Sequence, residues 1–469
     1  MAEIEYGDWM SESDALMWHM ERDPLLRSTI TSVWVLDRSP DPDRLQAAVA
    51  GAIADIPRLR QRVVADRAAI APPKWELDPL FDPTYHLRSG RLGGAGTLRD
   101  LLDHAAPLAG QAFDKDRPLW ELHVLDGMAD GRAGVIMKLH HAISDGVGLV
   151  KMTGSLLERS REPPDDTPRQ MPPAGDPPHR AGDGATRLGD ALRHQAETGL
   201  RRSAGLMSAA GRGAFRLARD PLGTSQAAVG TVGSIARSLR PVNEPMSPIM
   251  VGRSMSVRFD ALQIEIARLK RAGSRAEGTV NDAYVAAVLG GLARYHRHHG
   301  ADVGELRMTM PINIRSAGDR GATAGNAFAP ARFAVPLTID DPVERMATVR
   351  ELVRRQRAEP AYARVGGISA ALYSLGPSVF TRLTGSMLKA IDFVTSNVPG
   401  PPFPVYTSGA LVERNIPFGP LGGAGLNLTL YGYDGIAEVG INVDVAAVPD
   451  GDVLTACLRE SFEEVGALS

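Results

Sequence analysis

Two adjacent histidines follow an apolar run in the first third of the chain. Residues 140–146 read His-His-Ala-Ile-Ser-Asp-Gly and come directly after the strand-like residues 135–139. Side chains alternate along a strand, so His141 shares a face with the apolar residues 135, 137 and 139, and His140 shares a face with Lys138. Because a fully apolar face is the more buried one, we expect His141 to be a desolvated, neutral imidazole. Such a ring accepts a proton near neutral pH and can act as a general base.

The residues around these histidines restrict the chemistry further. Adjacent strand residues point apart, and no nearby Cys or His-x-x-Glu pattern supplies more ligands, so we expect no metal site. Asp145 lies four residues after His141 and has the chemistry to orient its ring, as the acid of a Ser-His-Asp triad does. Gly146 removes a side chain where a substrate must approach the turn. The pattern therefore favours proton transfer.

Several further segments accompany the histidine motif, which is the signature of acyltransferases with the chloramphenicol-acetyltransferase-like fold. The chain has Pro-Leu-Trp at 118–120, Thr-Val-Asn-Asp at 279–282, Asn-Ile-Arg at 313–315 and Ser-Asn-Val-Pro-Gly-Pro at 396–401. In this order, and across nearly the whole chain, the segments resemble the bacterial wax ester synthase/acyl-CoA:diacylglycerol acyltransferase family. The stretch from about 162 to 250 carries no motif of this kind.

The resemblance implies an α/β chain with a two-lobed chloramphenicol-acetyltransferase-like fold and an active-site tunnel between the lobes. It implies an O-acyltransferase that moves a long-chain acyl group from acyl-CoA to diacylglycerol, a long-chain alcohol, or both. Acyl-CoA is then a co-substrate, and we expect no cofactor. The sequence has no Gly-x-Ser-x-Gly elbow, which favours direct attack without an acyl-enzyme. The alternatives are a related acyltransferase that uses another acceptor or a carrier-bound thioester, and a weakly catalytic lipid-binding or droplet-coating protein.

The resemblance also suggests roles for individual residues. The catalytic group is His141 as base, with His140, Asp145 and Gly146. In this superfamily the aspartate usually turns away from the ring and pairs with an arginine, for which Arg315 is the candidate. The expected channel and support residues are divided between substrate binding (Asn281, Trp120, Ser396, Asn397) and structural support (Asp282, Pro118, Pro399). Asp282 also has a simple local explanation, because Thr279 and Asp282 are spaced as a capping box.

The composition is that of an ordinary globular protein. The 469 residues are 43% hydrophobic and 23% charged, and the net charge of −3 does not suggest a nucleic-acid partner. The single cysteine, Cys457, excludes an internal disulfide. Neither a signal peptide nor a membrane-spanning run is recognisable, so we expect a cytoplasmic protein that is peripherally associated with the inner face of a membrane or with lipid droplets.

Three segments are expected along the chain. Residues 1–160 form an N-terminal lobe, residues 161–250 a Pro-rich linker followed by a basic helical stretch at 187–219, and residues 251–469 a C-terminal lobe. The basic stretch is compatible with two functions. One is binding to an anionic lipid surface, and the other is a crossover helix packed on the protein.

The spacing of apolar residues, together with capping and turn residues, predicts individual helices and strands. Strands are expected at 29–36, 119–125, 134–139 and 254–259, and helices at 43–55, 97–108, 146–160, 279–299 and 452–465. Asp260 is expected to cap a helix that ends at residue 271. Residues 426–443 are expected to form a hairpin that turns at Asp434-Gly435. The rigid Pro-Gly-Pro-Pro turn at 399–402 is expected to set a strand crossover between the lobes.

Overall fold

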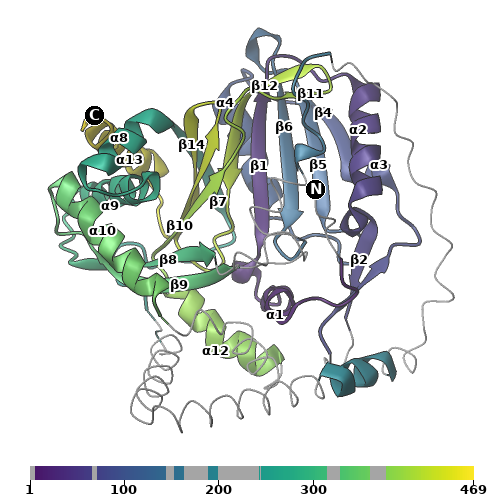
Figure 1. The fold of residues 1–469 in the computed structure, drawn as a ribbon, viewed down its shortest axis with the longest axis horizontal. Helices are drawn as coiled ribbons and strands as arrows, with labels where there is room; N and C mark the ends of the chain where they lie inside the picture. Colours follow the sequence, from purple (N-terminus) through teal and green to yellow (C-terminus); the bar gives the residue numbers. More distant parts are fainter. Residues whose placement is uncertain are drawn as a thin grey trace, which may run out of the picture.

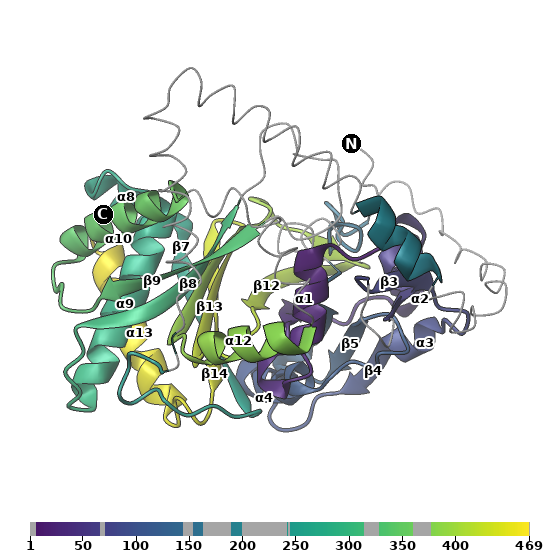
Figure 2. The same cartoon turned by 90° about the horizontal axis from the view of Figure 1, so that it is seen from below.

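The computed structural model describes residues 6–65, 71–143, 153–162, 189–198, 242, 244–313, 328–359 and 377–468. Within these ranges the chain forms two lobes, each built around a twisted sheet (Figure 1). Most helices lie on the outer sides of the two sheets (Figures 1 and 2), whereas the helix of residues 98–110 contacts strands of both sheets. The two-lobed α/β architecture expected from the sequence is confirmed.

The N-terminal sheet carries the histidine motif on a central strand. Its strand order is β11-β12-β1-β6-β5-β4, and β6 is antiparallel to both of its neighbours. The bounds are β1 (Thr29–Leu36), β4 (Leu87–Arg91), β5 (Trp120–Asp126), β6 (Ala133–His140), β11 (Tyr406–Thr407) and β12 (Ala410–Phe418). The short pair β2 (Gln61–Val64) and β3 (Lys74–Leu77) forms a separate ribbon. The helices of this lobe are α1 (Glu12–Met20), α2 (Pro42–Asp55), α3 (Pro83–His86) and α4 (Leu98–Gly110).

The C-terminal sheet has the order β7-β14-β13-β10-β8-β9. Strand β10 runs parallel to β13 and β8, and the other pairs are antiparallel. The bounds are β7 (Val257–Glu265), β8 (Glu305–Asn313), β9 (Phe328–Pro336), β10 (Phe393–Pro399), β13 (Leu426–Tyr433) and β14 (Ile436–Asp444). Helices α8 (Ile266–Arg275), α9 (Val280–His298), α10 (Pro342–Arg357) and α13 (Gly451–Gly466) cover one face, and α12 (Pro377–Lys389) lies beside α1.

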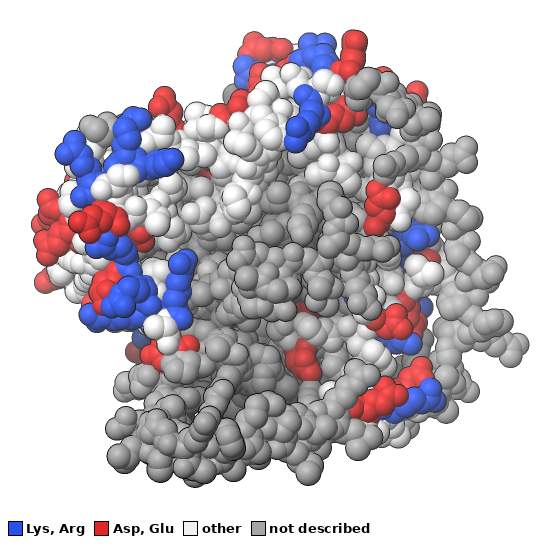
Figure 3. Space-filling view, in the orientation of Figure 1, with Lys and Arg blue, Asp and Glu red and all other residues white. Residues whose placement is uncertain are grey.

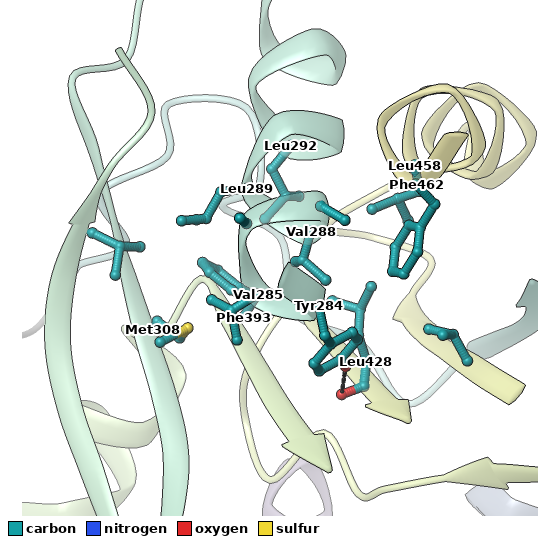
Figure 4. Close-up of a cluster of buried hydrophobic side chains, with 14 of the residues drawn as sticks. Tyr284, Val285, Val288, Leu289, Leu292, Met308, Phe393, Leu428, Leu458 and Phe462 are labelled. Carbon is teal, nitrogen blue, oxygen red and sulfur yellow. Dashed lines mark hydrogen bonds between the residues drawn. The ribbon is translucent and has the colours of Figure 1, made fainter. Parts of the chain in front are cut away.

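Helix α9 forms the centre of the C-terminal core. Tyr284 is completely buried, and its hydroxyl donates to the carbonyl of Leu428 at 2.8 Å (Figure 4). Gly291 lets α13 approach closely, since a Cβ on this residue would lie 2.8 Å from the Cα of Leu458. A helix that is apolar on all sides is expected in a protein core, and α9 is enclosed between the sheet and α13 in this way.

A segment from the second half of the sequence completes the sheet of the N-terminal lobe, and ion pairs also connect the two lobes. Strands β11 and β12 come from the second half of the sequence, yet they complete the N-terminal sheet, as expected from the Pro-Gly-Pro-Pro turn. Arg414 on β12 forms two hydrogen bonds, 2.9 and 2.7 Å, to the buried carboxylate of Glu438 on β14. Arg99 on α4 reaches Asp260 on β7 at 2.7 Å. The paired hydrogen bonds of Arg414 restrain the orientation of the two sheets where they meet.

Most predicted elements agree with the structure, and two do not. The expected helix cap at Asp260 is wrong, because β7 continues to Glu265 in a nine-residue ladder with β14. The carboxylate of Asp260 binds Arg99 and Arg258 instead. The predicted helix at 146–160 does not reach its expected end, since Glu158 makes an antiparallel bridge with Tyr406. In both cases pairing with a strand distant in sequence prevails over local helical preference.

The remaining expectations concern turns and membranes. The hairpin of β13 and β14 turns at Asp434 and Gly435, whose φ angles of 46° and 79° fit a primed turn, as predicted. No helix within the described ranges is both long and apolar enough to cross a bilayer. Of the basic stretch at 187–219, the structure describes a helix over residues 189–198.

Candidate active site

The histidine pair lies where β6 ends. The backbone N–H of His140 donates to Leu119 on one side at 3.0 Å, and that of His141 donates to Ser28 on the other at 2.8 Å. The chain then turns, and the N–H of Ile143 returns to the carbonyl of His140 at 3.0 Å. Two neighbouring strands thus fix the backbone of both histidines.

His140 is completely buried, and both of its ring nitrogens have short contacts. The backbone N–H of Ala142 donates to Nδ1 at 3.0 Å, and Nε2 lies 3.0 Å from a carboxylate oxygen of Glu21. Because Nδ1 accepts, a neutral ring has its proton on Nε2, the nitrogen that lies 3.0 Å from Glu21. This arrangement holds the His140 ring in one tautomer and one orientation.

Glu21 links the histidine strand to the segment that follows α1. Its carboxylate also accepts the backbone N–H of Ser28 at 2.8 Å. Burial alone raises the pKa of the Glu21 carboxyl, but the hydrogen bond from His140, its charge interaction and the Ser28 N–H outweigh this and lower it. Since the carbonyl of Ser28 holds His141, Glu21 supports both histidines. We missed this residue in the sequence, where nothing local distinguishes it.

His141 is the more exposed of the two histidines, which corrects one expectation. Every residue of β6 is buried, so neither face of the strand is distinguished by solvent. His140 ends the strand inside the protein, whereas His141 lies in the turn and is half-buried. The prediction that the apolar face would make His141 the more desolvated ring is therefore wrong. His141 retains partial exposure, and its role as the base remains a prediction.

A second charged group lies on the His140 face of β6. Lys138 is 1% exposed, its ammonium lies 3.7 Å from Glu121, and it sits 4.3 Å from the centre of the Phe113 ring. Burial lowers the pKa of Lys138, while the charge of Glu121 opposes the shift. Glu121 also lies 3.0 Å from Nε2 of His123. A lysine inside an apolar run was the sequence signal for this cluster.

The Pro-Leu-Trp segment lies within the N-terminal core. Trp120 is buried, its indole N–H donates to the carbonyl of Leu59 at 2.9 Å, and its ring stacks on His86 at 4.6 Å. Pro118 is buried beside it, and its carbonyl accepts the N–H of Trp120 at 3.0 Å. Both residues belong to the part of the N-terminal core that packs next to β6.

The expected C-terminal residues gather at one end of β10. The amide groups of Asn397 and Asn281 approach to 3.4 Å, which joins the end of β10 to the first turn of α9. Thr279 and Asp282 form the predicted capping box, in which Asp282 accepts the N–H of Thr279 at 2.7 Å. Ser396 is half-buried, and its backbone pairs with Thr429, while Pro399 is exposed at the strand end. The structure therefore brings Asn281 and Asn397 together.

Three expected residues, Asp145, Gly146 and Arg315, lie outside the described residues. Their roles, including the pairing of Asp145 with Arg315, remain predictions.

Comparison with known proteins agrees with this architecture. The wax ester synthase/diacylglycerol acyltransferase catalytic domain matches residues 10–284, and the WS/DGAT C-terminal domain matches residues 324–466. A Mycobacterium tuberculosis protein, provisionally named a diacylglycerol O-acyltransferase, is 35% identical over 465 residues, which cover 99% of this chain and 92% of that protein.

Solved structures share the fold at lower identity. The wax ester synthase/diacylglycerol acyltransferase of Marinobacter aquaeolei VT8 superposes with a TM-score of 0.64 at 20% identity, covering 98% of each chain. The starter condensation domain of rhizomide synthetase, in complex with C8-CoA and Leu-SNAC, gives a TM-score of 0.58 at 14% identity, covering 98% and 94% of the two chains. The matched domains span both lobes of the structure. The chain therefore belongs to the wax ester synthase/diacylglycerol acyltransferase family and is an acyl-CoA-dependent O-acyltransferase.

Proposed function

We propose that this enzyme transfers a long-chain acyl group from acyl-CoA to diacylglycerol, to a long-chain alcohol, or to both, with His141 as general base. His141 takes the proton of the acceptor hydroxyl while its oxygen attacks the thioester carbonyl. The tetrahedral intermediate collapses, the carbon–sulfur bond breaks, and the protonated His141 returns the proton to the CoA thiolate. No acyl-enzyme forms, and acyl-CoA is the only cofactor-like molecule required.

The observation that carries this proposal is the contrast between the two histidines. Nδ1 of His140 accepts the Ala142 N–H, and its Nε2 lies 3.0 Å from Glu21, so both ring nitrogens already face protein groups. His141 is fixed through its backbone and is half-buried in the turn, where an acceptor can approach its ring. A general base must lie within hydrogen-bond reach of the proton that it removes, and His141 meets this requirement better.

The developing oxyanion needs donors that are already oriented. Asn281 at the start of α9 is one candidate, and its contact with Asn397 restrains the amide. Backbone N–H groups are the other. Trp120, Ser396 and Pro118 are assigned to the channel wall in this proposal. Asp145 is assigned to an ion pair with Arg315 that stabilises the turn, and Gly146 to close approach of the substrate.

The acceptor class is tested directly by a substrate panel. Purified protein is incubated with palmitoyl-CoA and, separately, dioleoylglycerol, hexadecanol, a short alcohol and an amine acceptor. Free CoA and product mass are both measured. We expect triacylglycerol or wax ester with stoichiometric CoA. Amide formation alone, or lipid binding without CoA release, would contradict the proposal.

We also propose that the enzyme contacts its insoluble acceptors at a membrane or droplet surface. The helix at 189–198 packs one side on the N-terminal lobe, where His194 stacks on Trp9 at 4.3 Å and Asp190 lies 3.9 Å from Lys74. Its other side exposes Leu192 and Arg193. Elsewhere, acidic and basic side chains are interspersed over the helices of the C-terminal lobe (Figure 3), as where Glu351 pairs with neighbouring arginines.

Liposome co-sedimentation tests this surface. Binding to vesicles with anionic lipid should weaken as salt rises, because each arginine near the surface contributes about 1 kcal/mol that salt screens. Leu192→Ser combined with Arg193→Gln should weaken it further, by on the order of fivefold. Ala196→Ser, at an exposed position of the same helix, leaves the charge unchanged and serves as the control. Binding that ignores both salt and the double substitution would mean that another surface meets the lipid.

A further inference from the structure

A second cavity, of about 50 Å³, lies where the two lobes meet. Arg27 and the β1 residues Thr29 and Thr31 line it from the N-terminal lobe, and Phe259 on β7 and Asn442 on β14 line it from the C-terminal lobe. The cavity has room for about three to five water molecules, or for one ion with about as many heavy atoms, since each water needs about 10–15 Å³. A guest of this size would contact both lobes at once.

Two buried oxygens at this cavity have no hydrogen-bond partner in the described part of the chain. Thr31 is 1% exposed and Asn442 is 6% exposed, yet Oγ1 of Thr31 and Oδ1 of Asn442 are unpaired. Nδ2 of Asn442 donates to the carbonyl of Gly419 at 2.8 Å, so the unpaired end of this amide is the acceptor. Because buried polar groups in folded proteins normally have a partner, these two atoms indicate a polar guest.

The charge around the cavity favours an anion. Arg27 donates to the carbonyl of Gly110, and none of the described side chains that line the cavity is acidic. Lys138 pairs with Thr31 across β1 and β6. Burial lowers the pKa of Lys138 and Glu121 opposes this shift, but the positive charge of Arg27 adds to the lowering. A negative charge beside Arg27 would therefore interact favourably with two cations.

We propose that this cavity binds a phosphomonoester group, as free hydrogen phosphate or as the head group of a lipid, and that the bound group bridges the two lobes. Its unprotonated oxygens accept from the guanidinium of Arg27 and the hydroxyl of Thr31. Its P–OH donates to Oδ1 of Asn442, which a fully deprotonated anion such as sulfate cannot do. The one anion thus satisfies both unpaired atoms and the cation.

Access and position fit such a ligand. The cavity wall includes Pro24 and Met255, which are exposed, so a guest can enter from the surface. None of the described residues that line it belongs to the histidine motif or to the other expected site residues. The phosphomonoester site is therefore expected to be independent of the acyl donor.

The first test is calorimetric titration of the full chain with sodium phosphate at pH 6, where phosphate monoesters retain part of their last proton. Sodium sulfate is the matched ion, and phosphate should bind on the order of tenfold more tightly, since sulfate leaves Oδ1 of Asn442 unpaired. Arg27→Gln should weaken phosphate binding on the order of tenfold, whereas Arg91→Gln, at an exposed position of β4, should not change it. Equal affinity for the two ions, or equal effects of the two substitutions, would indicate an adventitious ion only and overturn the proposal.

A second variant provides an answer if Arg27→Gln fails to fold. Thr31→Val replaces the unpaired hydroxyl by a methyl group of similar size, so without phosphate its melting temperature should be no lower than that of the wild type. Added phosphate should raise the melting temperature of the wild type more than that of Thr31→Val, because a ligand stabilises in proportion to its binding. An equal rise in both proteins would contradict the proposal.

Further titrations identify the source of the phosphate. Dihexanoyl phosphatidate carries a phosphomonoester, whereas dihexanoyl phosphatidylcholine carries a phosphodiester without a P–OH. Binding of phosphatidate that is tighter than that of free phosphate and is weakened by Arg27→Gln would support the lipid as the source. Binding of free phosphate alone would support the ion. Equally tight binding of phosphatidylcholine, or loss of phosphate binding in saturating palmitoyl-CoA, would overturn the proposal.

Discussion

The two faces of β6 are equally buried but have opposite chemistry. On one face, Lys138 and His140 lie against Glu121 and Glu21, and their contacts are charged or hydrogen-bonded. On the other, Met137 and Leu139 line a hydrocarbon cavity. One strand therefore separates a polar region, which orients groups, from an apolar region that belongs to the hydrophobic core. The comparison shows that burial alone does not identify a catalytic face, since the partners of each side chain decide what it can do.

Burying the charged groups of Lys138, Glu121 and Glu21 on this face of β6 costs free energy. Moving an ammonium or carboxylate out of water costs several kcal/mol, and the ion pair recovers this only with good geometry and extra hydrogen bonds. The contact of Lys138 with Glu121 is long at 3.7 Å, and burial lowers the pKa of Lys138. We infer that the polar face fixes the end of β6, where the histidines lie, and contributes little to net stability.

Replacing either histidine by alanine should have the largest effect on activity. His141→Ala should lower kcat by about 10² to 10⁴-fold, the usual loss when a general base is removed. His140→Ala should retain more activity, because the ring acts through its contacts with Ala142 and Glu21, and should lower stability. Steady-state rates and denaturant unfolding of both variants separate the roles. A dead His140→Ala beside a His141→Ala that turns over normally would reverse the assignment.

Removing one partner of the buried ion pair between Lys138 and Glu121 should have the next largest effect, a loss of stability. Glu121→Ala leaves the Lys138 ammonium buried without its carboxylate, a change that typically destabilises by about 3–5 kcal/mol. The double variant Glu121→Leu with Lys138→Met should recover most of this loss. Urea unfolding measures the three free energies. Equal loss in the single and double variants would show that these positions contribute through shape and not through charge.

Removing Glu21 should affect stability less and activity more selectively. Glu21→Ala leaves the Nε2–H of His140 and the N–H of Ser28 without their acceptor, at about 1–3 kcal/mol for each buried group. Since Ser28 holds the backbone of His141, kcat should fall while KM changes little. Glu21→Gln keeps one acceptor oxygen and should restore part of both losses. A Glu21→Ala protein with wild-type stability and kcat would exclude the positioning role.

Acidification should reveal the smallest effect, at another buried ring in the same lobe. Burial, together with Arg22 and Lys115, lowers the pKa of His19 to about 4. In the unfolded chain this ring titrates near 6.5, so between pH 4 and 6.5 the unfolded state binds more protons and stability rises with pH. His19 alone gives a slope of at most about 1.4 kcal/mol per pH unit. His19→Gln should flatten the free energy of unfolding in this window relative to the wild type, and an identical slope would contradict it.

Features that depend on neighbouring residues could be predicted from the sequence. The capping box of Thr279 and Asp282 and the turn at Asp434-Gly435 involve residues at most three positions apart, and both are confirmed. The strands β1 and β6 were also foreseen, because their apolar runs are bounded by clear turn signals.

Features that depend on distant pairing could not be predicted. Asp260 has the local pattern of a helix cap, but the ladder with β14, more than 170 residues away, keeps it in a strand. The relative burial of His140 and His141 was misjudged because alternation assigns faces without saying what covers them. Glu21 reaches His140 through tertiary packing alone. In each case the deciding contact is formed only when the lobes fold.

The central claim, that His141 and not His140 moves the proton, is tested most directly by chemical rescue. His141→Gly and His140→Gly are assayed with palmitoyl-CoA and an acceptor alcohol over a range of added imidazole and pH. We predict that imidazole restores turnover in His141→Gly, and that the rescue rises with the fraction of imidazole that is unprotonated. His140→Gly should not respond. Near-wild-type turnover of His141→Gly without imidazole, or rescue confined to His140→Gly, would contradict the account.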